Sequence, residues 1–181
     1  MRRKLVSERP YGPRDKLLYV IPSQVIHETE KVLMEYANIE PSNEGLVYWG
    51  GTRRKDAVTV RAVIAPRTTS SYGGVSISHR SNFDFVGALD QHNLVQIAQV
   101  HSHPTEWVGH SLGDDEMAAF KIEGLLSIVV PEYCTSGMLP LTKCGVHRYV
   151  RGDFKRLSEK YVCNHFIIKE GIGSLLEDFR R

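Results

Sequence analysis

Hydrophobic and polar positions follow two different periods along the chain. Between residues 23 and 37 apolar side chains recur every three or four positions, with charged side chains between them, which predicts an amphipathic helix. Between residues 57 and 64 apolar and polar side chains alternate, which predicts a strand with one buried face. Residues 44–51 are mostly apolar and end in Gly50-Gly51, which indicates a short buried strand running into a glycine turn.

Shorter patterns complete the set of expected elements. Strands are predicted at residues 94–103, 125–130 and 146–150. Residues 83–89 predict one or two helical turns, and residues 114–123 predict a helix. Loops are expected at residues 67–80, which are rich in Ser, Thr and Gly, and at residues 138–143.

Helices and strands are interleaved without an internal repeat, a low-complexity run or a linker. The expected fold class is therefore α/β in the mixed α+β sense, with one domain spanning residues 1–181. Within this domain we expect an irregular N-terminal arm at residues 1–16, a core at residues 17–151 and a C-terminal extension at residues 152–181. The mixed pattern of the extension predicts no defined element.

The composition is that of an ordinary globular protein, with 41% hydrophobic and 24% charged residues. Its 23 basic and 21 acidic residues give a formal net charge of +2. We therefore expect no nucleic acid partner, although Arg53, Arg54 and Lys55 form a local basic patch. No apolar run has the length of a secretory signal or of a membrane span, so no membrane association is expected and a cytoplasmic location is the default.

The three cysteines, Cys134, Cys144 and Cys163, are irregularly spaced and form no C-x-x-C pair. A disulfide framework and a zinc ribbon are therefore not expected. The same spacing argues against a zinc deaminase, which needs an H-x-E element followed by P-C-x-x-C.

The segment His101-Ser102-His103-Pro104 carries the strongest chemical signal. Residues two apart on a strand project to the same face, so His101 and His103 can present two imidazoles to one ion. Asp114 follows at the expected start of a helix, where a carboxylate also interacts favourably with the helix dipole. Two histidines and a carboxylate form a catalytic type of zinc shell, because three protein ligands leave one coordination position for water.

Each part of this pattern has a simpler structural explanation. An H-x-H pair on a strand is commonly a surface or core pair, and Ser111-x-x-Asp114 alone is a helix-capping pattern. Asp114 also fits an acidic first turn shared with Asp115 and Glu116. The joint spacing of two histidines, a proline, a short loop and a Ser-x-x-Asp at a helix start favours a metal site.

Written as H-x-H, seven residues, then S-x-x-D, this spacing resembles the signature of the JAMM metallopeptidases, also called the JAB or MPN family. The match runs without a gap through His101, His103, Ser111 and Asp114, and the resemblance extends over residues 22–151. It implies a central, mostly antiparallel curved sheet flanked by helices. It also implies one zinc ion per chain, held by His101, His103 and Asp114.

The resemblance implies roles for two further residues. Ser111 would donate a hydrogen bond to the oxyanion of a tetrahedral intermediate, and Glu44 would act as the general base and then protonate the leaving amine. The family usually has small residues soon after this glutamate, whereas this chain has Leu46-Val47-Tyr48-Trp49 before the glycine pair. Glu35 and Glu40 are therefore alternative candidates for the base.

Members of the family commonly cleave after the C-terminal glycine of ubiquitin or a ubiquitin-like protein. The resemblance therefore implies a peptidase or isopeptidase that acts on a ubiquitin-like protein or its conjugates. It points to the prokaryotic branch that accompanies ubiquitin-like conjugation systems, including antiviral ones, with E1- and E2-like proteins from the same operon as partners. Relatives that lost their ligands serve as non-catalytic scaffold subunits, which is the alternative function; this chain keeps every ligand and the serine.

A cleaved tail has to lie extended beside the metal, and residues 67–80 are the expected element for holding it by strand addition. The candidate substrate-binding residues in this segment are Tyr72, Gly73, Gly74 and Ser76. We expect residues 133–143 to form the opposite wall and Trp107 to line the mouth of the site. At this spacing His110 has no place in the metal shell, and Ser102 faces away from the two histidines, so both are expected to be structural.

Overall fold

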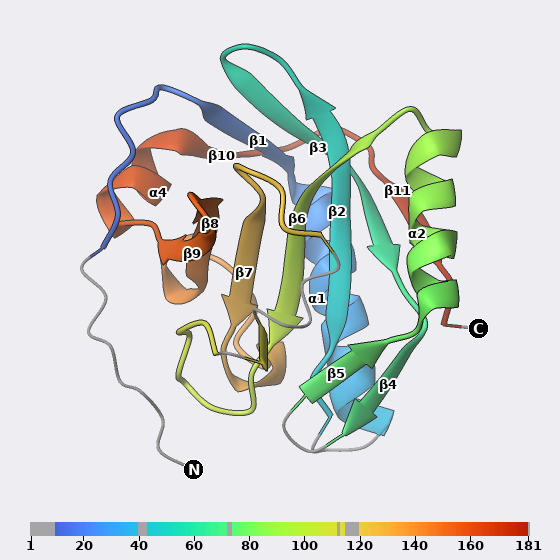
Figure 1. The fold of residues 1–181 in the computed structure, drawn as a ribbon. Coiled ribbons are helices and arrows are strands. Elements are labelled where there is room, and N and C mark those ends of the chain that lie inside the picture. The colour runs from blue at the N-terminus through green and yellow to red at the C-terminus, as the bar shows by residue number, and fades with distance from the viewer. Residues whose placement is uncertain (1–9, 40–42, 72–73, 112, 115–119, 181) are drawn as a thin grey trace.

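The computed structural model describes residues 10–39, 43–71, 74–111, 113–114 and 120–180 (Figure 1). A curled nine-stranded sheet forms its centre, and a separate two-stranded sheet stands beside it. The helices are α1 (Ser23–Ile39), α2 (His79–Gln91) and α4 (Glu159–His165), with single 3-10 turns η1 (Glu132–Cys134) and η2 (Leu141–Lys143). The strands in order across the large sheet are β10 (Phe166–Lys169), β1 (Leu18–Pro22), β3 (Ala57–Ala65), β2 (Leu46–Arg53), β6 (Val95–Ser102), β7 (Leu126–Val130), β8 (Gly145–Val150) and β9 (Asp153–Arg156), and β11 (Leu175–Asp178) also pairs with β3.

The expected fold class is confirmed, because helices and strands mix within one sheet-centred domain. The large sheet, expected to be mostly antiparallel, is mixed. Among the described strands, β10–β1, β1–β3, β11–β3 and β6–β7 are parallel, whereas β3–β2, β2–β6, β7–β8 and β8–β9 are antiparallel. The sheet is mixed because strands from both ends of the chain join β3 in its own direction.

Helix α1 covers one face of the sheet. Its buried Val25 and Leu33 belong to the same core cluster as Val47 and Trp49 of β2. The indole N–H of Trp49 donates to the hydroxyl of Thr29 at 2.8 Å, so the ring's polar atom is satisfied inside the core. Burying a side chain such as Leu33 stabilises the fold by about 1.5–3 kcal/mol.

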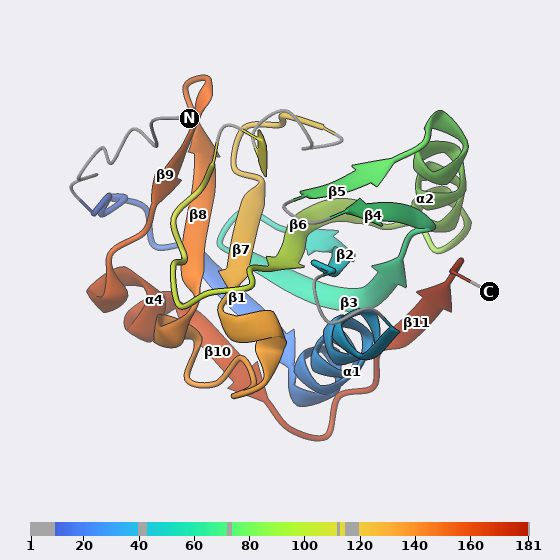
Figure 2. The ribbon, with the colours of Figure 1, turned by 90° about the horizontal axis from the view of Figure 1, so that it is seen from below.

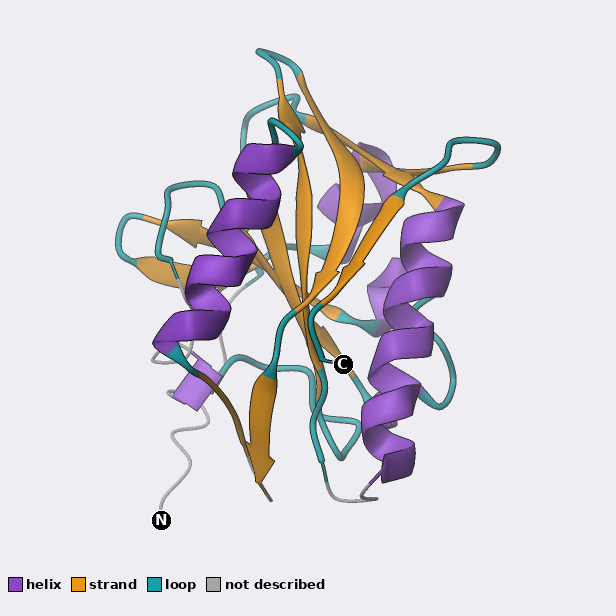
Figure 3. Cartoon of the chain, turned by 90° about the vertical axis from the view of Figure 1, so that its right-hand side faces the viewer, coloured by secondary structure: helices purple, strands orange, loops and turns teal. Residues whose placement is uncertain are grey.

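Helix α2 lies over the opposite face, and Figure 3 shows the sheet between these two long helices. Side chains alternate along β2, so Tyr48 points away from the face of Trp49 and stacks on Phe85 of α2, with ring centroids 4.2 Å apart. The helix begins at Ser78, whose hydroxyl accepts from the Ser81 N–H at 3.2 Å.

Residues 67–80 are not a loop, which corrects the expectation from sequence. The strands β4 (Thr68–Ser71) and β5 (Gly74–Ile77) form an antiparallel hairpin, and α2 begins directly after it. The helix expected at residues 83–89 is correspondingly longer. The hairpin's side chains are mostly polar, so no apolar alternation marked it as strand.

Strand β2 continues through Gly50 and Gly51, where a glycine turn was expected. The pairing register shifts at these glycines toward both neighbouring strands, which is a β-bulge. A Cβ atom on Gly51 would lie 2.3 Å from the carbonyl oxygen of Thr59. The glycine is therefore required by the close approach of β3, not by a turn.

The helix expected at residues 114–123 is wrong for its last part. Gly113 and Asp114 have helical backbone, residues 115–119 lie outside the described residues, and residues 120–123 are not helical. Within the part of the chain that the structure describes, no helix has the length and apolarity needed to cross a membrane.

Both ends of the chain take part in this architecture. The segment set apart as a C-terminal extension supplies β9, α4, β10 and β11. In the N-terminal arm, the Tyr11 N–H donates to the Arg156 carbonyl at 2.7 Å. The Asp15 carboxylate accepts from the Tyr161 hydroxyl at 2.5 Å and from Arg148 at 2.7 Å.

Candidate metal centre

One end of the large sheet brings together segments that are far apart in the sequence. Strands β3, β6 and β7 end there, and β2 and β8, which run antiparallel to them, begin there. The hairpin β4–β5 follows β3, residues 103–114 follow β6, and η1 follows β7. Figure 1 shows this as the lower end of the sheet, and Figure 2 shows it from below.

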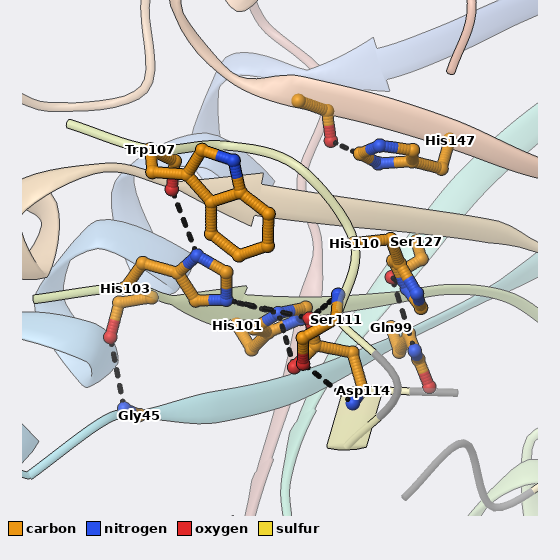
Figure 4. Close-up of polar contacts among 12 residues, drawn as sticks. Gly45, Gln99, His101, His103, Trp107, His110, Ser111, Asp114, Ser127 and His147 are labelled. Atoms are coloured by element: carbon orange, nitrogen blue, oxygen red, sulfur yellow. Dashed lines mark hydrogen bonds and ion pairs between the residues drawn. The ribbon is translucent and has the colours of Figure 1, made fainter. Parts of the chain in front are cut away.

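His101 and His103 lie at the end of β6. His101 pairs with Leu46 of β2 and with Val129 of β7, and His103 follows just beyond the strand. Their Nε2 atoms are 3.2 Å apart, and both residues are only 5% exposed (Figure 4). The two rings therefore project to the same side, as the period of a strand predicts.

The second ring nitrogen of His103 fixes its tautomer. Its Nδ1 lies 2.9 Å from the carbonyl oxygen of Trp107, which can only accept, so Nδ1 carries a proton. In the neutral ring, Nε2 then presents its lone pair toward His101 and Asp114. The Trp107 indole stacks on the imidazole with 9° between the ring planes and remains 38% exposed.

Asp114 reaches the histidines from the far end of the loop. Its Oδ1 lies 3.4 Å from His101 Nε2, and its Oδ2 lies 3.5 Å from His103 Nε2. The Ser111 N–H donates to Oδ2 at 2.6 Å, and the Asp114 N–H donates to the Ser111 hydroxyl at 3.1 Å. This reciprocal pair is a helix cap, so the capping explanation and the metal-site explanation describe the same two residues.

The spacing of these ligand atoms fits a single ion. One nitrogen or oxygen atom from each of His101, His103 and Asp114 lies within 4.8 Å of the others. Ligands about 2.0–2.2 Å from a tetrahedral zinc are about 3.3–3.6 Å apart. The two Nε2 atoms are 3.2 Å apart, and each lies 3.4 or 3.5 Å from a different oxygen of the Asp114 carboxylate. Nitrogen and carboxylate donors are also the chemistry that zinc takes in catalytic sites.

Charge at the site favours metal binding. Burial raises the pKa of Asp114, but hydrogen bonds and charge from His101 and His103 outweigh it and hold this pKa well below its usual range. Burial lowers the pKa of His101. Burial also opposes protonation of His103, but the neighbouring Asp114, Trp107 carbonyl and Glu44 raise its pKa overall. Asp114 is therefore ionised at neutral pH, the form that binds a cation.

Glu44 is buried two residues before β2 and is 7% exposed. Burial raises the pKa of its carboxyl; the charge of His103 lowers it and that of Asp114 raises it further. Glu44 thus lies within electrostatic reach of the group, and a raised pKa suits a residue that accepts and returns a proton. The alternative Glu35 is on α1, 2.7 Å from Arg180, and Glu40 lies outside the described residues.

The loop that carries Ser111 crosses the sheet at Gly145. A Cβ atom there would lie 1.8 Å from the carbonyl oxygen of Val108, so a larger residue at this position would displace the loop. Beside the crossing, His110 stacks on Phe154 at 4.5 Å, and its Nε2 is 2.8 Å from the Ser127 hydroxyl. His110 lies outside the ligand group, as its spacing predicts.

Two of the predicted substrate-binding residues, Gly74 and Ser76, lie on β5 of the hairpin. Gly74 opens β5 opposite Ser71, and the exposed Ser76 donates its hydroxyl to the Thr69 carbonyl at 3.1 Å. Tyr72 and Gly73 lie outside the described residues. Residues 133–143 follow β7 and so lie on the opposite side of β6 from the hairpin.

Sequence reasoning missed a buried polar row behind His101. Gln99, Ser127 and His147 face one another across β6, β7 and β8. The Gln99 amide donates to the Ser127 hydroxyl at 3.1 Å, and Nδ1 of His147 donates to the Gly145 carbonyl at 3.0 Å. Polar residues inside otherwise apolar strands were the available signal, but only the strand register shows that they align.

Neither the models of known protein families nor the sequences of curated proteins match this chain. Among solved structures, the chain is similar to the solution structure of protein DSY2949 from Desulfitobacterium hafniense, a target of the Northeast Structural Genomics Consortium. The two are 18% identical, with a TM-score of 0.60 over 86% of this chain and 95% of that one. At this identity the likeness supports the mixed α/β fold and no statement about activity.

Proposed function

We propose that this chain is a zinc-dependent peptidase of the JAMM type that cleaves after the C-terminal tail of a ubiquitin-like protein. One observation carries the proposal: the buried group of His101, His103 and Asp114 fits one tetrahedral ion and has the carboxyl of Glu44 within electrostatic reach. The unbroken H-x-H, seven residues, S-x-x-D spacing supports the same conclusion.

The residues of the site divide the chemistry between them. Bound zinc supplies Lewis acidity and lowers the pKa of a coordinated water. Glu44 accepts a proton from the attacking water and passes it to the leaving amine, which its raised pKa favours. The hydroxyl proton of Ser111 is not used in its bond with Asp114, where the oxygen accepts, so Ser111 can donate to the developing oxyanion.

The position of the hairpin supports a substrate with an extended tail. Strand β4 follows β3, and β3 ends at the same end of the sheet as β6, so the hairpin and the ligand group lie at one end of the sheet (Figure 2). Backbone groups of such a hairpin can pair with a tail as an added strand. A ubiquitin-like protein or its conjugate, delivered by E1- and E2-like partners, is the substrate class that we propose.

The test separates metal binding from catalysis. Purified protein should carry about one zinc per chain, and His101→Ala/His103→Ala should lose it. Glu44→Gln should keep the zinc, because Glu44 is not a ligand, but lower the cleavage of a ubiquitin-like fusion by about 10²–10⁴-fold. Elemental analysis and single-turnover cleavage measure the two quantities. The matched control is Glu106→Gln, an exposed acid of the same loop, which should change neither.

Three results would contradict parts of this proposal. Full zinc occupancy in the double histidine variant would remove the metal centre. Wild-type turnover in Glu44→Gln would assign the base to another group. A zinc-loaded protein that cleaves no ubiquitin-like fusion would favour the scaffold alternative.

A further inference from the structure

We propose that Ser102 is a positioning residue for Glu44. Its hydroxyl fixes the backbone of Gly45 and thereby places the Glu44 carboxylate beside the three candidate metal ligands. The inference rests on the proposed function, in which Glu44 moves the proton. Ser102 lies between the two histidines in the sequence, but its side chain projects to the face of β6 opposite to theirs.

Two hydrogen bonds join Ser102 to the residue that follows Glu44. The Gly45 N–H donates to the Ser102 hydroxyl at 2.9 Å, and the Ser102 N–H donates to the Gly45 carbonyl at 3.0 Å. They extend the contact between β2 and β6 beyond its last register pair, Leu46 with His101. A regular antiparallel ladder uses backbone carbonyls as acceptors, whereas here a side-chain oxygen accepts from Gly45.

The next residue, His103, is bonded to the other neighbouring strand, as alternation along a central strand requires. The His103 N–H donates to the Val130 carbonyl, and the His103 carbonyl accepts from the Tyr133 N–H, both at 2.8 Å. These bonds fix the backbone of His103 against β7 and η1. The Ser102 hydroxyl is the acceptor for the Gly45 N–H and, with the Ser102 N–H, holds the segment leading into β2.

Gly45 is fixed from its other side by α1. A Cβ atom at this position would lie 2.9 Å from a ring carbon of Tyr36 and 3.0 Å from a methyl carbon of Leu33. Neighbouring residues of an extended segment project to opposite faces. Gly45 therefore faces α1, and Glu44 is directed to the other face, the one that carries His101.

The buried setting makes this contact sensitive to a small change. Ser102 is fully buried and Glu44 is 7% exposed. Bulk water therefore does not reach this position to replace the hydroxyl as the acceptor for the Gly45 N–H. Losing the acceptor leaves the Gly45 N–H without its partner and lets the segment shift. A displacement of about 1 Å in a proton-transfer geometry can cost about 10²-fold in rate.

Ser102→Ala tests the proposal by removing only the hydroxyl. We expect kcat to fall by about 10²-fold while KM and zinc content stay at wild-type values. The Gly45 amide should exchange its hydrogen about tenfold faster, measured by NMR. Ser102→Thr, which keeps the hydroxyl, should restore most of kcat and most of the slow exchange of the Gly45 amide. The matched control is Thr29→Val, which removes another buried hydroxyl that accepts an N–H, from Trp49 at 2.8 Å, and should leave kcat unchanged.

A double variant separates positioning from general damage. On a Glu44→Gln background, Ser102→Ala should change the residual rate by less than about twofold, because nothing remains for it to position. The inference would be overturned if Ser102→Ala lowered the residual rate by about the full 10²-fold on that background. It would also be overturned if the Gly45 amide exchanged at the wild-type rate in the Ser102→Ala single variant. Absence of cleavage by zinc-loaded wild-type protein would contradict the proposed function instead, and the exchange rate would still decide whether Ser102 fixes Gly45.

Discussion

The imidazole of His103 is oriented by the loop that follows it as much as by its strand. The Nδ1–H donates to the Trp107 carbonyl, and the Trp107 indole covers one ring face. The backbone N–H is bonded to Val130. A ligand with a fixed tautomer and a fixed ring plane loses little freedom when an ion binds. At the scale of single residues, the centre is therefore preorganised.

His147 gives a testable pH dependence at the same scale. Burial is the main cause that lowers its pKa to about 3 from 6.5, and the charges of His110, Arg156 and His101 add to it. Between these values the unfolded chain binds a proton that the folded chain does not. The free energy of unfolding should therefore be highest above pH 6.5 and fall as the pH drops toward 3.

Urea unfolding of zinc-free protein between pH 7 and pH 4 measures this effect. His147→Gln, whose amide can still donate to the Gly145 carbonyl, should remove up to about 1.4 kcal/mol of pH dependence per pH unit. Parallel pH profiles of the wild type and the variant would show that His147 titrates normally in the fold.

At the scale of elements, the hairpin β4–β5 is the part of the proposed site that sequence and structure describe differently. Deleting residues 71–76 should lower kcat/KM for a ubiquitin-like fusion by at least about tenfold, because the tail loses an edge to pair with. Bound zinc should be unchanged, since none of the three candidate ligands lies on the hairpin. The control is Arg54→Ser/Lys55→Ser, in the turn between β2 and β3 at the opposite end of the sheet. Equal activity of both proteins would leave the hairpin without a role in capture.

Elements with strong local periodicity were predictable from sequence, and α1 and β3 lie almost where the pattern puts them. Strands β10 and β11 were not predictable, because each has four residues and is defined by pairing with a distant strand. The turn η1 was also hidden: Glu132, Tyr133 and Cys134 have positive φ angles, a conformation that sequence signals assign to glycine or asparagine. Tertiary contacts, including the bond from the Tyr133 N–H to His103, hold it there.

The candidate site likewise has parts that a local sequence pattern predicts and parts that depend on the pairing of distant strands. His101 and His103 were predictable as a pair because alternation along one strand is a local property. The approach of Glu44 depends on the register that places Leu46 opposite His101, which no local pattern contains. The function of Ser102 as an acceptor for Gly45 depends on the same register.

At the scale of the whole molecule, the C-terminal segment links the first helix to the base of the hairpin. Arg180 lies 2.7 Å from both Glu35 of α1 and Asp178. The side chain of Arg67, just before β4, donates to the Phe179 carbonyl at 3.1 Å. The C-terminal segment, although far from the candidate ligands in the sequence, therefore contacts the base of the hairpin proposed to capture substrate.

Arg180→Met should loosen that link while keeping an apolar stem against Tyr36, whose ring lies 5.2 Å from the guanidinium. Because the ion pairs are partly exposed, we expect the free energy of unfolding to fall by only about 1 kcal/mol. KM for a ubiquitin-like fusion should rise severalfold as the hairpin base moves, with kcat and zinc content unchanged. Arg148→Met is the matched control, because it breaks a pair of similar exposure with Asp15 on β8, away from the hairpin. Denaturant unfolding and steady-state cleavage of both variants measure these effects. If the two variants have the same KM, the C-terminal segment stabilises the fold without positioning the hairpin.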